Sequence, residues 1–259
     1  MKKIEYNRGR ISPAKEIAAV AVMCALLIGG QLALSFVSGV EVVTVLLLSF
    51  SFTYGRRAGA LTAISFSLLR CFIAGFVPNV IVLYLIYYTV FALTFGALGS
   101  VKREVYENFP VWAAVIVNFV IALLAIGCGL CAATNFLKIS RLSVVIVKTL
   151  LWIIFGLSCA MLVVFNTVFV MQKRGKLKSK STLIVVVVTS AAAIFTVCFT
   201  LLDDFITPLF MGWGLFSESA AAYFFASFLA LAPQTVCTIV SVSTLFLPLN
   251  AIFGKTISK

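Results

Sequence analysis

Long apolar runs recur along almost the whole chain, and the polar segments between them are short. A helix needs about 20 predominantly apolar residues to cross a hydrocarbon core of about 30 Å, and most of the runs are near or above that length. The strand pattern of a β-barrel, about ten residues of alternating apolar and polar character, does not occur. Because lipid admits only helices or closed barrels as spanning structures, the pattern predicts an all-α polytopic transmembrane helical bundle.

Eight of these runs are candidate spans, and together they predict one integral membrane domain over residues 1–259. The second candidate is short for a spanning helix. The candidate spans are Ile17–Val37, Val40–Tyr54, Ala58–Val77, Val80–Gly99, Val111–Leu137, Ser143–Met171, Ser181–Leu202 and Ala220–Leu247.

The composition agrees with this class, with 63% hydrophobic residues and a mean hydropathy of +1.17. The formal charge of +12 is a value that nucleic-acid-binding proteins also reach, but here the basic residues gather at the ends of the spans. With a cytoplasmic N-terminus, only Lys138 and Arg141 of the 20 basic residues fall outside, while Arg70 and Lys148 fall within spans. The positive-inside rule therefore predicts that both termini are cytoplasmic.

Arg70 is the most informative single residue, because it lies within the otherwise uncharged segment 58–77. An ionisable group inside a span is costly and usually faces a partner or a water-filled cavity. At 1.5 Å per residue, Arg70 would lie on the order of 10 Å below the outer end of its helix, a depth that suits a pocket open to the outside. The alternatives are a structural ion pair with Glu41, at the start of the second span, or an arginine that snorkels to the interface.

Three tyrosines follow in the outer part of the next span. Tyr84, Tyr87 and Tyr88 have i, i+3, i+4 spacing and come soon after Asn79. This spacing puts the three rings on one face of a helix. They are expected to form either an interfacial aromatic belt or a wall that stacks on a heteroaromatic ligand.

The seventh span is predicted to end at two adjacent carboxylates, Asp203 and Asp204. The apolar outer segment that follows is broken by Pro208 and Gly212 and contains Trp213. It is predicted to be a lid over a pocket or a plain interfacial loop. Neighbouring carboxylates on a helix point about 100° apart, so this pair is poorly placed as a catalytic acid and base.

Several chemistries are disfavoured by residue type. The chain has no histidine, which removes His-based triads and His-ligated zinc or haem. Cys128 and Cys131 have CxxC spacing but are expected to be small apolar residues of a helix. No catalytic residue, metal or cofactor is predicted, and no phosphate-binding loop for ATP is present. Among the embedded amides, Asn118 and Asn166 are expected to hydrogen-bond between helices more readily than to bind substrate.

The first hundred residues carry a family resemblance. It rests on Ala18-Ala-Val-Ala-Val-Met-Cys-Ala25, Gln31-Leu-Ala-Leu-Ser-Phe-Val, Val40-Glu-Val-Val-Thr, Tyr54-Gly-Arg-Arg-Ala-Gly-Ala60 and the helix of Arg70. These segments resemble the substrate-binding S components of energy-coupling factor (ECF) transporters. The last two spans, beginning with Leu202-Asp-Asp-Phe-Ile-Thr-Pro, resemble that family more loosely.

The resemblance implies a partner system and a function. S components capture vitamins or related micronutrients from outside, and they dock on a membrane-embedded T component that works with two ATPase subunits. A small-xxx-small pair on the first helix makes that contact, and Ala21 and Ala25 occupy the matching positions. The expected protein is a non-enzymatic subunit of a multi-pass bacterial cell-membrane transporter, without nucleic acid as a partner.

In this interpretation the ligand pocket faces outward. Arg70 would pair with an anionic or carbonyl group of the ligand, and the three tyrosines would wall the pocket. The segment from Asp203 to Trp213 would cover it, and Glu41 and Asn79 are further candidate substrate-binding residues.

The chain departs from the family in its number of spans, since S components generally have six. The extra pair, residues 111–171, would be an inserted helical hairpin. Two other function classes remain open: a self-sufficient ion-coupled secondary transporter, although no clear internal repeat is visible, and a membrane enzyme or scaffold. The reactive candidates for an enzyme are limited to Asp203, Asp204 and Glu218.

Overall fold

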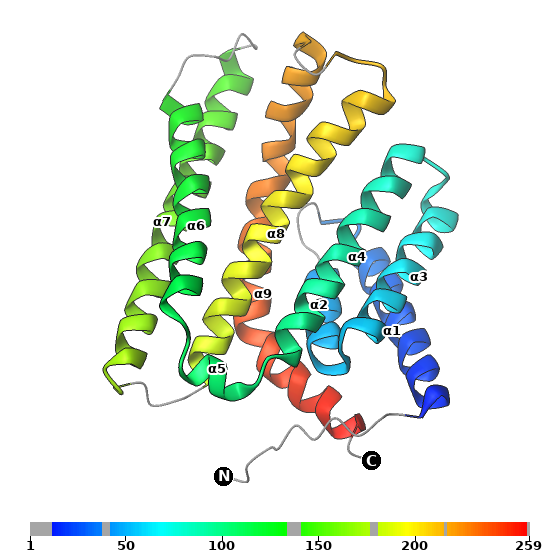
Figure 1. Cartoon of the computed structure of the whole chain (residues 1–259). Coiled ribbons are helices and arrows are strands. Elements are labelled where there is room, and N and C mark those ends of the chain that lie inside the picture. Colours follow the sequence, from blue (N-terminus) through cyan, green and yellow to red (C-terminus); the bar gives the residue numbers. More distant parts are fainter. Residues whose placement is uncertain (1–11, 38–41, 134–140, 177–180, 215–216, 258–259) are drawn as a thin grey trace. The chain divides into compact units, whose positions relative to one another are not determined.

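The computed structural model of the chain describes residues 12–37, 42–133, 141–176, 181–214 and 217–257, and within these ranges every regular element is a helix (Figure 1). The helices are α1 (Pro13–Ala33), α2 (Val43–Tyr54), α3 (Arg56–Ala74), α4 (Pro78–Ser100), α5 (Arg103–Glu107), α6 (Val111–Ala133), α7 (Arg141–Lys173), α8 (Ser181–Phe210) and α9 (Glu218–Ile257). Each of the eight predicted spans overlaps one of these helices, with ends that differ by several residues, and α5 is an additional short helix.

Within the described residues, six helices are long and apolar enough to cross a membrane, namely α1, α4, α6, α7, α8 and α9. The all-α prediction is therefore confirmed, and the chain is a helical protein with six candidate membrane spans. Helix α2 has only 12 residues, which at 1.5 Å per residue is about 18 Å and falls short of a bilayer core. Apart from the short α5, helix α3 is the least apolar of the described helices, because it contains Arg56, Arg57 and Arg70.

Glycine and proline set the boundaries of the first helices. Gly55 separates α2 from α3 and has a φ of 95°, a backbone conformation that residues with a Cβ atom rarely adopt. Gly75, also at 95°, follows the last residue of α3. Helices α1 and α4 begin at Pro13 and Pro78, where the missing N–H of proline has no helical partner to lose.

Helix α8, which corresponds to the seventh predicted span, is longer than the sequence indicated. It was expected to end at Leu202 before an outer loop or lid, but α8 continues through Asp203 and Asp204 to Phe210. Pro208 lies in the last turn of this helix and removes the backbone donor that would bond the carbonyl of Asp204. Helical hydrogen bonding still continues past it, because the amide of Met211 donates to the carbonyl of Thr207 at 3.0 Å. The chain leaves the helix at Gly212, which has a φ of 69°.

The chain divides into two compact units. Unit 1 comprises Met1–Ser35, Val42–Val101 and Thr244–Lys259, and unit 2 comprises Phe36–Glu41 and Lys102–Ser243. Helices α1 to α4 therefore belong to unit 1 and helices α5 to α8 to unit 2, while α9 contributes to both. The hairpin predicted over residues 111–171 corresponds to α6 and α7 and lies within unit 2.

Unit 1 is held together by close backbone approaches and by aromatic contacts. A Cβ atom at Gly96 of α4 would lie 2.7 Å from the backbone of Arg56, so α4 packs directly on the junction of α2 and α3. The last turns of α9 pack on α2, where the Phe52 and Phe246 rings meet edge to face at 5.0 Å. The hydroxyl of Thr53 also donates a hydrogen bond of 2.8 Å to the side-chain oxygen of Asn250.

Unit 2 has two apolar clusters and a polar bridge between its first long helices. One cluster contains Ala132, Val147, Leu151, Ile154, Val197, Phe228, Leu231 and Ala232, and the other contains Tyr106, Phe109, Ala114, Phe165, Leu183 and Val187. Asn118 of α6 and Asn166 of α7 exchange side-chain hydrogen bonds of 3.1 and 2.7 Å. The predicted interhelical role of these two amides is confirmed.

Candidate functional site

Arg70 lies in the C-terminal half of α3 and is half-buried. Its Nε atom is buried and has no hydrogen-bond partner among the described residues. One turn earlier, the hydroxyl of Ser67 donates to the carbonyl oxygens of Ala63, at 2.8 Å, and of Tyr84, at 3.2 Å, which ties α3 to α4. A buried donor without an acceptor is unfavourable, so the Nε of Arg70 is a candidate partner for an acceptor that the described residues do not supply.

The three predicted tyrosines form one aromatic cluster with Phe66 of α3. Tyr88 lies at its centre, with ring centroids 5.3 Å from Phe66, 5.2 Å from Tyr84 and 5.0 Å from Tyr87, all edge to face. Tyr87 and Tyr88 are 6% and 4% exposed. Rings this deeply buried differ from those of an interfacial belt, which face the lipid headgroups. Tyr84, half-buried, is the most accessible ring of the three.

Asn79 is buried in the first turn of α4, directly after Pro78. The structure therefore brings Arg70, the tyrosine cluster and Asn79 into the same helical pair, α3 and α4 of unit 1 (Figure 1). Glu41, the predicted alternative partner of Arg70, lies outside the described residues.

A second polar cluster joins α8 to the start of α9 in unit 2. Asp203 accepts hydrogen bonds from Thr207 at 2.7 Å and from Tyr223 at 2.8 Å. The ring of Tyr223 also meets Trp213 edge to face, with centroids 6.3 Å apart. Two predicted site residues, Asp203 and Trp213, are thus linked through Tyr223, which was not among the predicted site residues.

Asp204 points to a different group from its neighbour. Its Oδ2 accepts from the hydroxyl of Ser227 at 3.0 Å, while its Oδ1 is buried and has no partner among the described residues. The two carboxylates therefore have separate environments, as expected of adjacent helical positions. Tyr223 and Ser227 are one helical turn apart, and this i, i+4 spacing of hydroxyls near the start of the last span was the available signal for both.

The predicted site residues fall into both units. Arg70, Asn79 and the tyrosines belong to unit 1, while Asp203 and Trp213 belong to unit 2. The expectation that these residues line a single pocket stays a prediction.

The predicted docking residues lie on an open face of α1. Ala21 and Ala25 are exposed, whereas Met23, Cys24 and Leu27 on the same helix are buried at 4% exposure or less. The helix therefore packs into unit 1 with one side and presents small residues on another.

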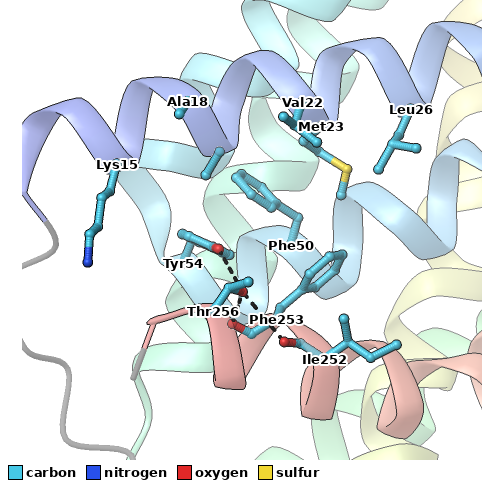
Figure 2. Close-up of a pocket in the computed structure, with 11 residues that line it drawn as sticks. Lys15, Ala18, Val22, Met23, Leu26, Phe50, Tyr54, Ile252, Phe253 and Thr256 are labelled. Atoms are coloured by element: carbon cyan, nitrogen blue, oxygen red, sulfur yellow. Dashed lines mark hydrogen bonds between the residues drawn. The ribbon is translucent and has the colours of Figure 1, made fainter. Parts of the chain in front are cut away.

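Unit 1 also has a pocket, at the end away from Arg70, that was not predicted from the sequence. It has a volume of about 380 Å³, and its walls come from residues 15–26 of α1, the end of α2 and the last turns of α9 (Figure 2). The lining residues are Lys15, Ala18, Ala19, Val22, Met23, Leu26, Phe50, Tyr54, Ile252, Phe253 and Thr256. Sequence reasoning missed it because α1 and α9 are at opposite ends of the chain, and a contact between them depends on tertiary packing.

Within the described part of the chain, no group of three or more Cys, Asp or Glu side chains could hold a metal ion. Cys128 and Cys131 are free thiols one turn apart on α6. No family model, curated protein or solved structure matches this chain. The functional assignment therefore has to come from the geometry and the residues themselves.

Proposed function

We propose that this chain is the substrate-binding subunit of an ATP-driven uptake system, similar in role to an ECF S component. It captures a vitamin or related micronutrient at the outer face of a bacterial cell membrane and carries out no chemical step on it. Both termini lie in the cytoplasm, and all eight apolar segments contribute to the membrane domain. A membrane-embedded T component and two ATPase subunits are its partners.

The observation that carries this proposal is the buried Nε of Arg70, which lacks a hydrogen-bond partner among the described residues. A guanidinium in an apolar helix is costly unless an anionic or carbonyl group pairs with it. Tyr84 is the accessible edge of an aromatic cluster on the next helix, and aromatic rings favour a planar ligand. A substrate with a ring and an acidic or carbonyl group fits these two features.

A second observation supports the partner assignment. Ala21 and Ala25 are exposed on α1 and are one turn apart, so another helix could approach the α1 backbone closely. Added Cβ atoms would also be tolerated further along the helix, because one at Gly29 would meet no atom within 4 Å. The face is accessible for a partner helix.

The carboxylates of α8 favour a second candidate function, a self-sufficient ion-coupled transporter. Asp204 lies within a candidate span, and its Oδ1 is buried without a partner among the described residues. An embedded carboxylate of this kind is a typical proton or cation site in secondary transporters. Uptake by the purified chain in proteoliposomes, driven by an ion gradient without an ATPase, would favour this candidate.

The decisive experiment is affinity purification of the tagged chain from its native membrane in mild detergent, with mass spectrometry of both copurifying proteins and small molecules. The wild type is expected to recover a T component, two ATPases and a bound micronutrient. The double variant Ala21→Trp/Ala25→Trp is expected to lose the three proteins and keep the small molecule.

Helix α9 offers a matched control for the tryptophan substitutions. Ala222 and Ala226 are also exposed and one turn apart, but they lie in unit 2. Ala222→Trp/Ala226→Trp is therefore expected to retain the partner proteins. Recovery of the wild-type chain alone, in several detergents, would contradict the proposal.

A further inference from the structure

The pocket between α1, α2 and α9 is polar at one end and apolar at the other. Its polar groups are Lys15, the hydroxyl of Tyr54 and the hydroxyl of Thr256, and each comes from the first or last turn of its helix. Figure 2 shows these three side chains near the helix ends, whereas Met23 and Leu26 lie further along α1. A ligand that fits this pocket has a polar end and an apolar end.

The length of the pocket matches a lipid in its membrane orientation. Lys15 and Leu26 are eleven positions apart on α1, which corresponds to about 16 Å along the helix axis. Since α1 is a candidate span and Lys15 is in its first turn, the polar end lies at headgroup depth and the apolar end within the hydrocarbon layer. The pocket volume of about 380 Å³ is within the usual range of about 300–1,000 Å³ for small-molecule sites.

The charges around the polar end are predominantly positive. Lys15 lines the pocket, Arg56 and Arg57 follow Tyr54 after Gly55, and Lys255 precedes Thr256. The negative charge near these described residues comes from Glu16, whose carboxylate oxygen Oε1 lies 3.8 Å from Nε of Arg57. The N-terminal end of α1 adds the partial positive charge of its helix dipole. The excess of positive charge complements an anionic headgroup.

The hydroxyl groups at the polar end are already organised. Tyr54 donates to Thr256 at 3.1 Å, and Thr256 donates to the carbonyl oxygen of Phe253 at 2.7 Å. Both hydroxyl protons are therefore in use, which leaves Lys15 as the cationic donor of the pocket. An anion satisfies Lys15, whereas the positively charged amine of a zwitterionic headgroup gains nothing from it.

From these observations we infer that the pocket is a binding site for one anionic phospholipid, with its phosphate group at Lys15 and part of an acyl chain against Val22, Met23, Leu26 and Phe50. The lipid would join α1 to α2 and to the end of α9, so it would stabilise unit 1. This site is independent of the substrate and partners proposed above.

The test is native mass spectrometry of the full chain released from nanodiscs that contain equal amounts of phosphatidylglycerol and phosphatidylcholine. The wild type is expected to retain phosphatidylglycerol in preference to phosphatidylcholine. Lys15→Gln is expected to weaken the phosphatidylglycerol preference about fivefold, the effect of one lysine near an anionic lipid surface. Lys102→Gln, which removes an exposed lysine that does not line the pocket, should leave the preference unchanged.

A second variant tests the acyl-chain part of the site. Ala19→Trp places a large side chain in the pocket and should reduce lipid retention several-fold, whereas Ala160→Trp, at an exposed position of α7, should not. Glycerol 3-phosphate, which has a headgroup but no acyl chain, should not displace the bound lipid.

Three results would overturn the inference. These are equal retention of the two lipids by the wild type, equal losses in Lys15→Gln and Lys102→Gln, and displacement of the lipid by glycerol 3-phosphate. A photoreactive residue at position 26 provides a fourth check. It should crosslink to lipid, and a crosslink to a polypeptide instead would identify the pocket as a protein-docking groove.

Discussion

The hydroxyl of Tyr223 on α9 donates a hydrogen bond of 2.8 Å to Oδ2 of Asp203 on α8. The two residues are twenty positions apart, on either side of the turn that contains Trp213. The contact shows how unit 2 accommodates a carboxylate near the end of a candidate span. The hydroxyl groups of Thr207 on α8 and Tyr223 on α9 both donate hydrogen bonds to this carboxylate, and the Trp213 ring packs against the Tyr223 ring.

Tyr223→Phe is expected to lower the stability of the protein, because it removes a donor from a partly buried carboxylate and keeps the aromatic ring. Hydrogen bonds between membrane helices contribute about 0.6 to 1.7 kcal/mol in double-mutant cycles, and we expect a coupling of that size between Tyr223→Phe and Asp203→Asn. Thermal unfolding in detergent of the two single variants and the double variant gives this coupling energy. Additive losses would mean that the pair contributes nothing specific.

Arg70→Met is expected to abolish or strongly weaken substrate binding while leaving membrane insertion intact. The apolar replacement removes the charge and the unpartnered donor but keeps a long side chain in α3. Arg70→Lys should retain part of the binding, because it keeps the charge without the planar fork of the guanidinium. The measurement is the amount of small molecule that copurifies with each variant. Wild-type amounts with Arg70→Met would exclude this residue from the site.

Two glycines provide a matched test of packing in unit 1. A Cβ atom at Gly96 would meet the backbone of Arg56 at 2.7 Å, whereas one at Gly29 would meet no atom within 4 Å. Gly96→Ala is therefore expected to cost about 1–3 kcal/mol through overpacking, and Gly29→Ala to leave stability unchanged or slightly higher. Thermal unfolding compares the two. Equal stability of both variants would argue against the close contact of α4 with the α2–α3 junction.

Tyr106 is expected to make the stability of the protein depend on pH in the alkaline range. It lies on α5, outside the candidate spans, and burial raises its pKa from the ordinary value of 10 to about 12. Between these two values the unfolded chain loses the phenol proton while the folded protein keeps it. The contribution of Tyr106 to stability is therefore complete below pH 10 and is lost as the pH rises toward 12.

The matched variant for this prediction is Tyr106→Phe, which cannot ionise. The stability difference between wild type and variant should be constant from pH 8 to about pH 10 and should then shift against the wild type by on the order of 1 kcal/mol per pH unit. Unfolding curves recorded across this range measure the difference. A difference that does not change with pH would show that Tyr106 ionises equally in both states.

The sequence by itself determined the class of the protein and the positions of its helices. Hydrophobic runs predict spanning helices because the bilayer leaves the backbone no alternative, and each predicted run overlaps a helix. The i, i+3, i+4 spacing also put Tyr84, Tyr87 and Tyr88 on one face, and they do form one cluster. These properties are local, so a periodicity along the chain is sufficient to predict them.

The tertiary structure decided which residues from distant segments meet. Asp203 was selected from the sequence, but its partner Tyr223 was not, because a hydrogen bond between two helices depends on their register and rotation. The sequence did not predict that α8 continues through Pro208, because a proline is read from the sequence as the end of a helix. Whether the helix continues depends on its contacts with the rest of the protein. The pocket of Lys15, Tyr54 and Thr256 requires the first and last helices to pack together, which no periodicity along the chain encodes.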